Sequence, residues 1–252
     1  HRGFARIGST AADRGRGGAV RAPPGGRRHD PRDLEPSPLA TKDRVAYIDA
    51  ANYGQDLARL AECDLVIEAI AERMDWKHDL YAKIGPHLAP NAIVASNTSG
   101  LSINALAAAL PADVRRRFCG IHFFNPPRYM HLVELIAQKD TDPALLDRLE
   151  TFVVTTLGKG VIRAKDTPNF VANRVGIFSV LATMAHTERY GLSYDVVDAL
   201  TGPAIGRAKS ATYRTCDVVG LDTMAHVVKT MHDTLPDDPW HQYFKAPDWL
   251  QA

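Results

Sequence analysis

The sequence predicts an α/β fold followed by an all-helical domain. Three observations predict this class: short apolar runs alternate with helical patterns from residue 37 onward, the alternation stops after residue 164, and amphipathic helical patterns follow. At 252 residues, 45% of them hydrophobic, the chain is long enough to bury two small cores. We therefore expect two domains, which cover residues 37–165 and 166–252.

Short apolar runs bounded by turn residues are the expected strands, and segments with helical spacing are the expected helices. The expected strands are residues 64–70, 92–98, 118–124, 132–137 and 161–164. The expected helices of this half are residues 76–88, 103–110 and 144–157. An alternation of this kind favours a mainly parallel sheet that is covered by helices.

The last third of the sequence predicts a bundle of helices. Asp166 and Pro168 are expected to open a long helix over residues 167–190, which Gly191 ends. Two more helices are expected to start at residues 193 and 222. One broad apolar face follows the long helix at helical spacing, and it consists of Phe170, Val171, Val175, Phe178, Leu181 and Ala182.

Residues 1–36 differ in composition from the rest of the chain. They contain 8 Arg against 3 Asp and 1 Glu, together with 7 Gly and 4 Pro. Such a segment cannot bury enough apolar surface to offset the entropy that ordering costs, so we expect it to be disordered. It is either an Arg/Gly tail that touches nucleic acid or a stretch outside the fold, and we favour the second because the segment has a single aromatic residue, Phe4.

The overall composition excludes several classes of function. Lys and Arg number 30 against 29 for Asp and Glu, so charge alone would recruit neither nucleic acid nor an anionic membrane. Three cysteines without ligand spacing encode no disulfide framework and no metal site, which favours a cytoplasmic protein. The longest apolar stretch, residues 175–185, is shorter than the roughly 20 residues that span a membrane.

His122 and Glu134 are the candidate catalytic pair. They are placed symmetrically about Arg128, so they face each other if the two strands form an antiparallel hairpin. A carboxylate that faces an imidazole fixes its tautomer and raises its basicity, as a general base requires. The alternative is a hydrogen-bonded core histidine beside a solvated strand carboxylate.

Four motifs carry a resemblance to a known family. They are SNTSGLSI from Ser96, GIHFFNPP from Gly120, VELI from Val133 and KDTPNFVANRVG from Lys165. In this order and at these separations they resemble the NAD-dependent L-3-hydroxyacyl-CoA dehydrogenases of fatty-acid β-oxidation, over about residues 37–252. The resemblance implies a Rossmann-type domain that binds NAD, an L-3-hydroxyacyl-CoA substrate, and a helical domain for substrate binding and homodimerisation.

The same resemblance assigns roles to individual residues. It makes His122 the base that removes the 3-hydroxyl proton and Glu134 the residue that orients it. It places Ser99 and Asn173 within hydrogen-bonding reach of the reacting oxygen. Without the resemblance, Ser99 is a turn former and Asn173 a capping or solvent-facing residue near a helix start.

The cofactor positions also come from the resemblance. Glu72 and Lys77 match family positions on the nucleotide, while Ser99 and Asn125 match positions near the nicotinamide. The alternative for Glu72 and Lys77 is a pair of exposed charges near the start of a helix, which contribute little.

The sequence also departs from the family pattern at both ends. The family opens with a strand, a G-x-G-x-x-G turn and a second strand that ends in an acidic residue. Residues 15–20 lack the third glycine, and the chain stops at Ala252 before the usual glycine-rich closing segment. We therefore expect a member truncated at both ends, with a partial sheet that lacks its first strands and an incomplete helical domain. Three functions stay open: an active dehydrogenase, a non-catalytic remnant or dimerisation module, and a dehydrogenase of small 3-hydroxy acids.

Overall fold

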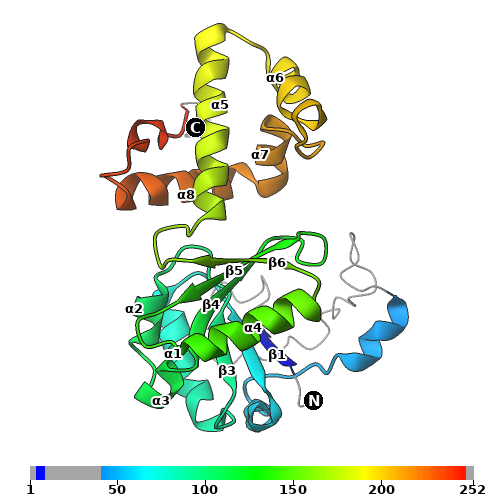
Figure 1. The fold of residues 1–252 in the computed structure, drawn as a ribbon, viewed down its shortest axis with the longest axis vertical. Helices are drawn as coiled ribbons and strands as arrows, with labels where there is room; N and C mark the ends of the chain where they lie inside the picture. Colours follow the sequence, from blue (N-terminus) through cyan, green and yellow to red (C-terminus); the bar gives the residue numbers. More distant parts are fainter. Residues whose placement is uncertain (1–3, 9–40, 248–252) are drawn as a thin grey trace. The chain divides into compact units, whose positions relative to one another are not determined.

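The computed structural model describes residues 4–8 and 41–247 (Figure 1). The chain divides into two compact units, of which the first ends at Asp166 and the second begins at Thr167. Each unit is described by itself below.

Unit 1 is built on a six-stranded sheet whose strands follow the order of the chain. The strands are β1 (Phe4–Gly8), β2 (Leu65–Ala69), β3 (Ile93–Ser96), β4 (Phe118–Phe123), β5 (Leu132–Ala137) and β6 (Gly160–Ala164). Every neighbouring pair is parallel except β4 and β5, which are antiparallel. The predicted class, a mainly parallel sheet followed by helices, is confirmed.

The expectation that residues 1–36 are disordered is wrong for residues 4–8, which form a strand. β1 pairs in parallel with β2, from Phe4 opposite Leu65 to Gly8 opposite Ala69. A five-residue strand at the end of a sheet obtains its hydrogen bonds from one neighbour, so the low average hydrophobicity of the opening segment does not prevent it. The expectation of disorder for the other residues up to 36 lies outside the described residues.

Helices cover both faces of the sheet. They are α1 (Met74–Ile84), α2 (Ile103–Ala107), α3 (Ala112–Arg115) and α4 (Pro143–Thr155), with short 3-10 helices at Lys42–Tyr47, Leu57–Glu62 and Gly85–His87. α4 crosses one face (Figure 1) and forms the main core with the strands, through Leu65, Ile67, Ala95, Cys119, Ile121, Val133, Leu135, Leu145, Leu146, Leu149 and Val153. Strand residues alternate between faces, so His122 lies on the opposite face from Cys119 and Ile121.

The face that carries His122 packs against α1 and α2. Phe118 meets the ring of Tyr81 from α1, with ring centroids 5.6 Å apart. Gly120 lies against Ile103 of α2, and a Cβ at this glycine would come within 2.9 Å of that side chain. The close approach of α2 to β4 therefore requires glycine at position 120.

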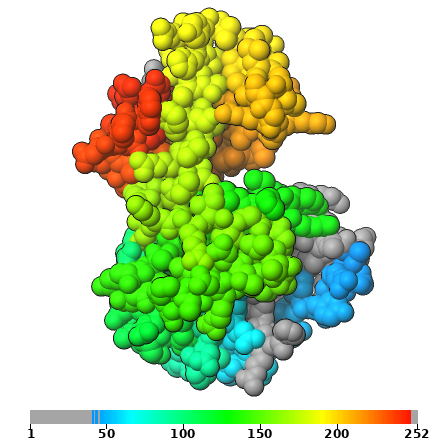
Figure 2. Space-filling view, viewed as in Figure 1, coloured from blue at the N-terminus to red at the C-terminus, as the bar shows by residue number. Residues whose placement is uncertain are grey.

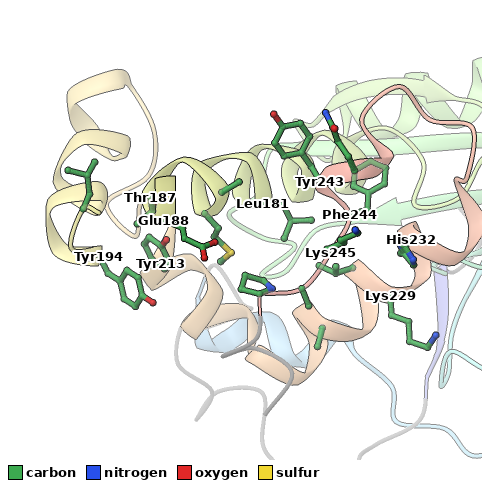
Figure 3. Close-up of a pocket in the computed structure, with 18 of the residues that line it drawn as sticks. Leu181, Thr187, Glu188, Tyr194, Tyr213, Lys229, His232, Tyr243, Phe244 and Lys245 are labelled. Atoms are coloured by element: carbon green, nitrogen blue, oxygen red, sulfur yellow. The ribbon is translucent and has the colours of Figure 1, made fainter. Parts of the chain in front are cut away.

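Unit 2 consists of helices among its described residues. They are α5 (Ala172–Tyr190), α6 (Tyr194–Thr201), α7 (Tyr213–Val219) and α8 (Leu221–Thr234), with short 3-10 helices at Pro203–Ile205 and His241–Tyr243. Their buried core is Leu181, Met184, Val197, Tyr213, Cys216, Met224, Val228, Met231 and Phe244. A cavity of about 1120 Å³ lies between α5, α8 and residues 242–247, and Figure 3 shows side chains from each of these segments around it.

The start of the long helix differs from the prediction. α5 begins at Ala172 rather than residue 167, because Asn169 and Phe170 adopt positive φ angles of 58° and 51°, which no right-handed helix contains. Its end is as predicted, since Gly191 caps it in the left-handed conformation. None of the helices in the described part is long and apolar enough to cross a membrane.

The predicted apolar face of α5 is largely used within unit 2. Leu181 is buried in the core, and the ring of Phe178 packs against Trp240 and Tyr243 with centroids 5.2 and 5.9 Å away. Phe170 is buried as well, whereas Val175 is 61% exposed. The segment after α8 folds back over part of this face, so unit 2 covers some of it and leaves the rest exposed.

Candidate active site

His122 and Glu134 form a buried pair at the junction of β4 and β5. The antiparallel register sets the two residues opposite each other, as the sequence predicts. His122 Nδ1 lies 2.8 Å from Glu134 Oε2, and the two residues are 3% and 0% exposed. The interpretation of Glu134 as a solvated carboxylate is therefore wrong. A proton on Nδ1, held by the carboxylate, leaves the lone pair on Nε2, which is the tautomer of a general base.

The turn after β3 carries Ser99 and is held by Glu72. Glu72 Oε1 accepts hydrogen bonds from Thr98 Oγ1 at 2.5 Å, from the Ser99 amide at 2.9 Å and from the Gly100 amide at 3.0 Å. The side chain of Glu72 is 40% exposed, and Ser99 is exposed. Glu72 thus fixes the backbone of the turn, while Ser99 itself remains exposed.

Asn97 joins this turn to the strand of the candidate base. Its Oδ1 accepts a hydrogen bond from the Phe123 amide at 2.9 Å, which ties the end of β3 to the end of β4. The carboxyl ends of β2, β3 and β4 therefore meet at one edge of the sheet, where open α/β sheets bind their ligands.

Asp166 anchors the other end of the same turn. Its carboxylate accepts hydrogen bonds from Ser102 Oγ, from the amides of Ile103 and Asn104, and from Asn104 Nδ2, at 2.7–2.9 Å. The sequence predicts that Asp166 opens α5; the structure shows instead that it caps the start of α2. A carboxylate at a helix N-terminus satisfies amides that have no partner within the helix.

Lys77 is buried under the turn and paired with a carboxylate that the sequence analysis did not single out. Its Nζ lies 2.7 Å from Glu68 Oε1 and 3.7 Å from Glu72 Oε2. Lys77 and Glu68 are 1% and 0% exposed, so this is not the exposed pair considered as the alternative. The ammonium group of Lys77 is enclosed by the carboxylates of Glu68 and Glu72 at the edge of the sheet. In this structure it presents no surface to a nucleotide.

Three further groups complete the surroundings of the Glu68 carboxylate. It also accepts hydrogen bonds from the Ile70 amide at 2.7 Å, from Tyr81 Oη at 3.0 Å and from Ser96 Oγ at 2.7 Å. Burial raises the pKa of Tyr81, and the nearby Glu68 carboxylate raises it further, so the hydroxyl remains a donor.

Asn125 and Asn173 occupy different units. Asn125 is exposed in the loop between β4 and β5, directly after His122, Phe123 and Phe124. Asn173 is the second residue of α5 in unit 2 and is partly exposed. The structure therefore brings His122, Glu134, Ser99 and the Asn125 loop together within unit 1, and it describes Asn173 separately.

Thiol and metal chemistry have no support among the described residues. Burial raises the pKa of Cys119 to about 12, and it raises that of Cys216 to about 11. Both thiols are therefore protonated near neutral pH and unreactive. No group of three or more His, Cys, Asp or Glu side chains in residues 4–8 and 41–247 could hold a metal ion.

The sheet is mainly parallel, and a histidine oriented by a carboxylate lies at the carboxyl ends of its strands. A separate helical unit follows the sheet in the sequence. These features define the class of Rossmann-type dehydrogenases. Residues 31–167 match the family described as 3-hydroxyacyl-CoA dehydrogenase, NAD binding domain. Residues 170–252 match the C-terminal domain of the same family. The chain belongs to the 3-hydroxyacyl-CoA dehydrogenase family.

Individual relatives agree with this assignment. A probable 3-hydroxyacyl-CoA dehydrogenase of Deinococcus radiodurans is 45% identical over 203 residues, which cover 81% of this chain and 59% of the relative. One of Bacillus subtilis is 42% identical over 86% of this chain and 27% of its own length. The crystal structure of (S)-3-hydroxybutyryl-CoA dehydrogenase from Ralstonia eutropha superposes with a TM-score of 0.70 at 29% identity, over 82% of this chain and 69% of that one.

Proposed function

We propose that the chain is an oxidoreductase that converts an L-3-hydroxyacyl-CoA to the 3-ketoacyl-CoA with NAD in fatty-acid β-oxidation. The observation that carries the proposal is the buried His122–Glu134 pair, with its 2.8 Å hydrogen bond, at the carboxyl edge of the sheet. The chain spans 59% and 27% of the two curated relatives described above, so its activity is inferred from the site as well as from the family.

The residues at this edge fit the nicotinamide end of NAD. Ser99 and Asn125 are exposed there on two neighbouring loops, and the Ser99 turn is already held rigid by Glu72 and Asp166. NAD bound at this edge would supply the acceptor for the hydride that leaves C3 of the substrate. Ser99 and Asn125 would hold the nicotinamide, and the half-exposed carboxylate of Glu72 lies against the Ser99 turn.

The protein residues handle the proton in this proposal. His122 Nε2 takes the proton of the substrate's 3-hydroxyl group, and Glu134 stabilises the imidazolium that forms. Hydride leaves more readily as the alkoxide develops, so a hydrogen bond from Ser99 to that oxygen would lower the barrier further. His122 thus gains the proton, and the substrate carbon loses the hydride.

Substitution of His122 tests the proposal directly. In the full chain, His122→Gln should lower kcat for a 3-hydroxyacyl-CoA by about 10² to 10⁴, the usual loss when a general base is removed. NADH formation followed by absorbance measures the rate, and the exposed His226, replaced by Gln, is the matched control. An unchanged kcat in His122→Gln contradicts the assignment of the base.

Two outcomes of the same assay separate the other hypotheses. A wild-type chain that binds neither NADH nor acyl-CoA is a non-catalytic remnant, and the proposed activity is then wrong. Turnover of free 3-hydroxy acids with no preference for the CoA thioester favours the dehydrogenase of small 3-hydroxy acids.

The proposed assembly is a homodimer through unit 2, in the cytoplasm. Support for the dimer comes from large apolar side chains that are exposed on this unit, among them Leu200 at 57%, Ile205 at 58% and Val218 at 80%. α6 and the segment after it form part of the visible surface of unit 2 (Figure 2). A second copy is the proposed cover for this surface. Support for the cytoplasm comes from the cysteines at 63, 119 and 216, all of which are free thiols.

A further inference from the structure

Lys159, the residue before β6, donates hydrogen bonds to the loop between β4 and β5. Its Nζ donates hydrogen bonds to the carbonyl oxygens of Pro127 at 2.6 Å, Arg128 at 3.3 Å and Met130 at 2.7 Å. An ammonium group has three N–H donors and no acceptor, so these carbonyls use its full capacity. Lys159 therefore acts here as a backbone ligand and not as half of a salt bridge.

The composition of the loop explains why it needs an external donor. Pro126 and Pro127 have no amide N–H, so the loop has fewer donors than carbonyl oxygens. Its internal bonds include those from the amides of Tyr129 and Met130, and both end on the carbonyl of Pro126 at 3.0 Å. The ammonium group of Lys159 supplies the donors that the two prolines remove.

The neighbour of Lys159 holds the far end of the same loop. The Gly160 amide donates to the carbonyl of His131 at 3.0 Å. A Cβ at Gly160 would lie 3.0 Å from two atoms of the His131 ring, so the ring rests on the bare backbone of the glycine. Lys159 and Gly160 together form a platform at the start of β6 on which the loop lies.

This loop begins at the candidate active site. Phe124, its first residue, packs its ring against the imidazole of His122 with centroids 4.5 Å apart. Asn125 follows. The next part of the loop provides the three carbonyl oxygens that surround Lys159 Nζ, which we call the carbonyl cage. The position of the loop thus bears on both the orientation of His122 and the placement of Asn125.

We propose that Lys159 is a positioning residue of the active site, whose ammonium group fixes residues 124–131 and thereby holds Asn125 and the Phe124 ring beside His122. The cage that it occupies is selective for a primary ammonium group, because the carbonyl oxygens need N–H donors as well as positive charge. The part that concerns Asn125 and the cofactor rests on the function proposed above, whereas the ordering of the loop does not.

The first experiment measures the loop itself. In the full chain, Lys159→Ala should speed amide hydrogen exchange at Tyr129 and Met130 by about tenfold or more, as expected when a charged hydrogen bond is lost. Ethylammonium chloride should restore protection by entering the vacated cage. Tetramethylammonium chloride at equal ionic strength should not, since it has the charge but no N–H donor. Lys165→Ala, an exposed lysine directly after β6, is the matched control and should behave as wild type.

The second experiment measures the active site. Lys159→Ala should weaken NADH binding by about tenfold, and ethylammonium should restore it. Simple loss of folded protein would lower the apparent kcat without changing the dissociation constant for NADH, so the two effects are distinguishable.

Each outcome decides the proposal. Unchanged exchange at Tyr129 and Met130 in Lys159→Ala overturns it, and so does equal rescue by both ammonium salts. Faster amide exchange at Tyr129 and Met130 with an unchanged dissociation constant for NADH overturns the claim that Lys159 positions Asn125 for the cofactor. A wild-type chain that binds no NADH overturns the proposed function, while the exchange experiment still decides what Lys159 does to the loop.

Discussion

Glu68 shows how a buried charge is accommodated at the edge of this sheet. Its carboxylate receives Lys77 Nζ, two hydroxyl groups and one backbone amide, and none of its surface reaches solvent. Burying such a pair costs much of the hydration free energy of both charges. Removal of one partner leaves the other as an unpaired buried charge. Because Lys77 also lies 3.7 Å from Glu72, the buried pair supports the turn that carries Ser99.

We expect Lys77→Met to destabilise the fold by about 3–5 kcal/mol, because it strands the Glu68 carboxylate. Combining it with Glu68→Gln should recover a large part of this loss, since no unpaired charge then remains. Urea unfolding monitored by circular dichroism measures both variants. Lys83→Met, an exposed lysine on the same helix, is the control and should change little. A double variant less stable than Lys77→Met would contradict the argument.

The site residues differ in how far the sequence could predict them. The spacing of His122 and Glu134 about Arg128 predicted their register. In an antiparallel hairpin, residues at equal distances from the centre of the turn face each other. Glu68 was missed because it stands within an apolar run, where pattern analysis assigns a strand and ignores a charged residue inside it. Lys159 was missed because its partners are backbone carbonyls, which leave no side-chain signature.

At the scale of elements, α2 depends on a residue far away in the chain. It has five residues, too few to persist as an isolated helix. Ser102 caps it locally by accepting from the Ala105 amide, and Asp166 satisfies the amides of Ile103 and Asn104. The stability of α2 therefore depends on β6, whose last residue, Ala164, lies two positions before Asp166.

We predict that Asp166→Ala releases α2 while the sheet stays folded. Loss of a capping carboxylate costs about 1 kcal/mol, so exchange at the amides of Ile103 and Asn104 should accelerate several-fold. Amide exchange followed by NMR resolves these positions, and Asp79→Ala, an exposed carboxylate on α1, is the comparison. Equal protection of α2 in both variants would show that the cap at Asp166 is dispensable.

Element boundaries follow the sequence wherever local chemistry decides them. β5 has the predicted bounds and β4 ends one residue earlier, because turn residues flank both apolar runs. The start of α5 was predicted too early, because the buried residues Asn169 and Phe170 adopt left-handed angles that a pattern of capping residues does not indicate. β1 was missed because the prediction for residues 1–36 was based on their average composition, which says nothing of a short strand at residues 4–8.

At the scale of the whole molecule, the proposed homodimer has a direct test. Val218 on α7 is 80% exposed, so Val218→Glu should disrupt a dimer interface without disturbing a core. Light scattering coupled to size exclusion should show a dimer for wild type and a monomer for this variant. Val154→Glu on α4 in unit 1, where valine is 44% exposed, should leave the dimer intact. A monomeric wild type at micromolar concentration would contradict the proposal.

The cap on α2 also sets an order of events during synthesis. Asp166 follows Ser102, Ile103 and Asn104 by 62 to 64 positions, so these groups leave the ribosome long before their carboxylate does. Chains fold from the N-terminus as they emerge, at about 5–20 residues per second. The turn that carries Ser99 can therefore reach its final form only several seconds later, when β6 has been translated, and the candidate active site is completed last within unit 1.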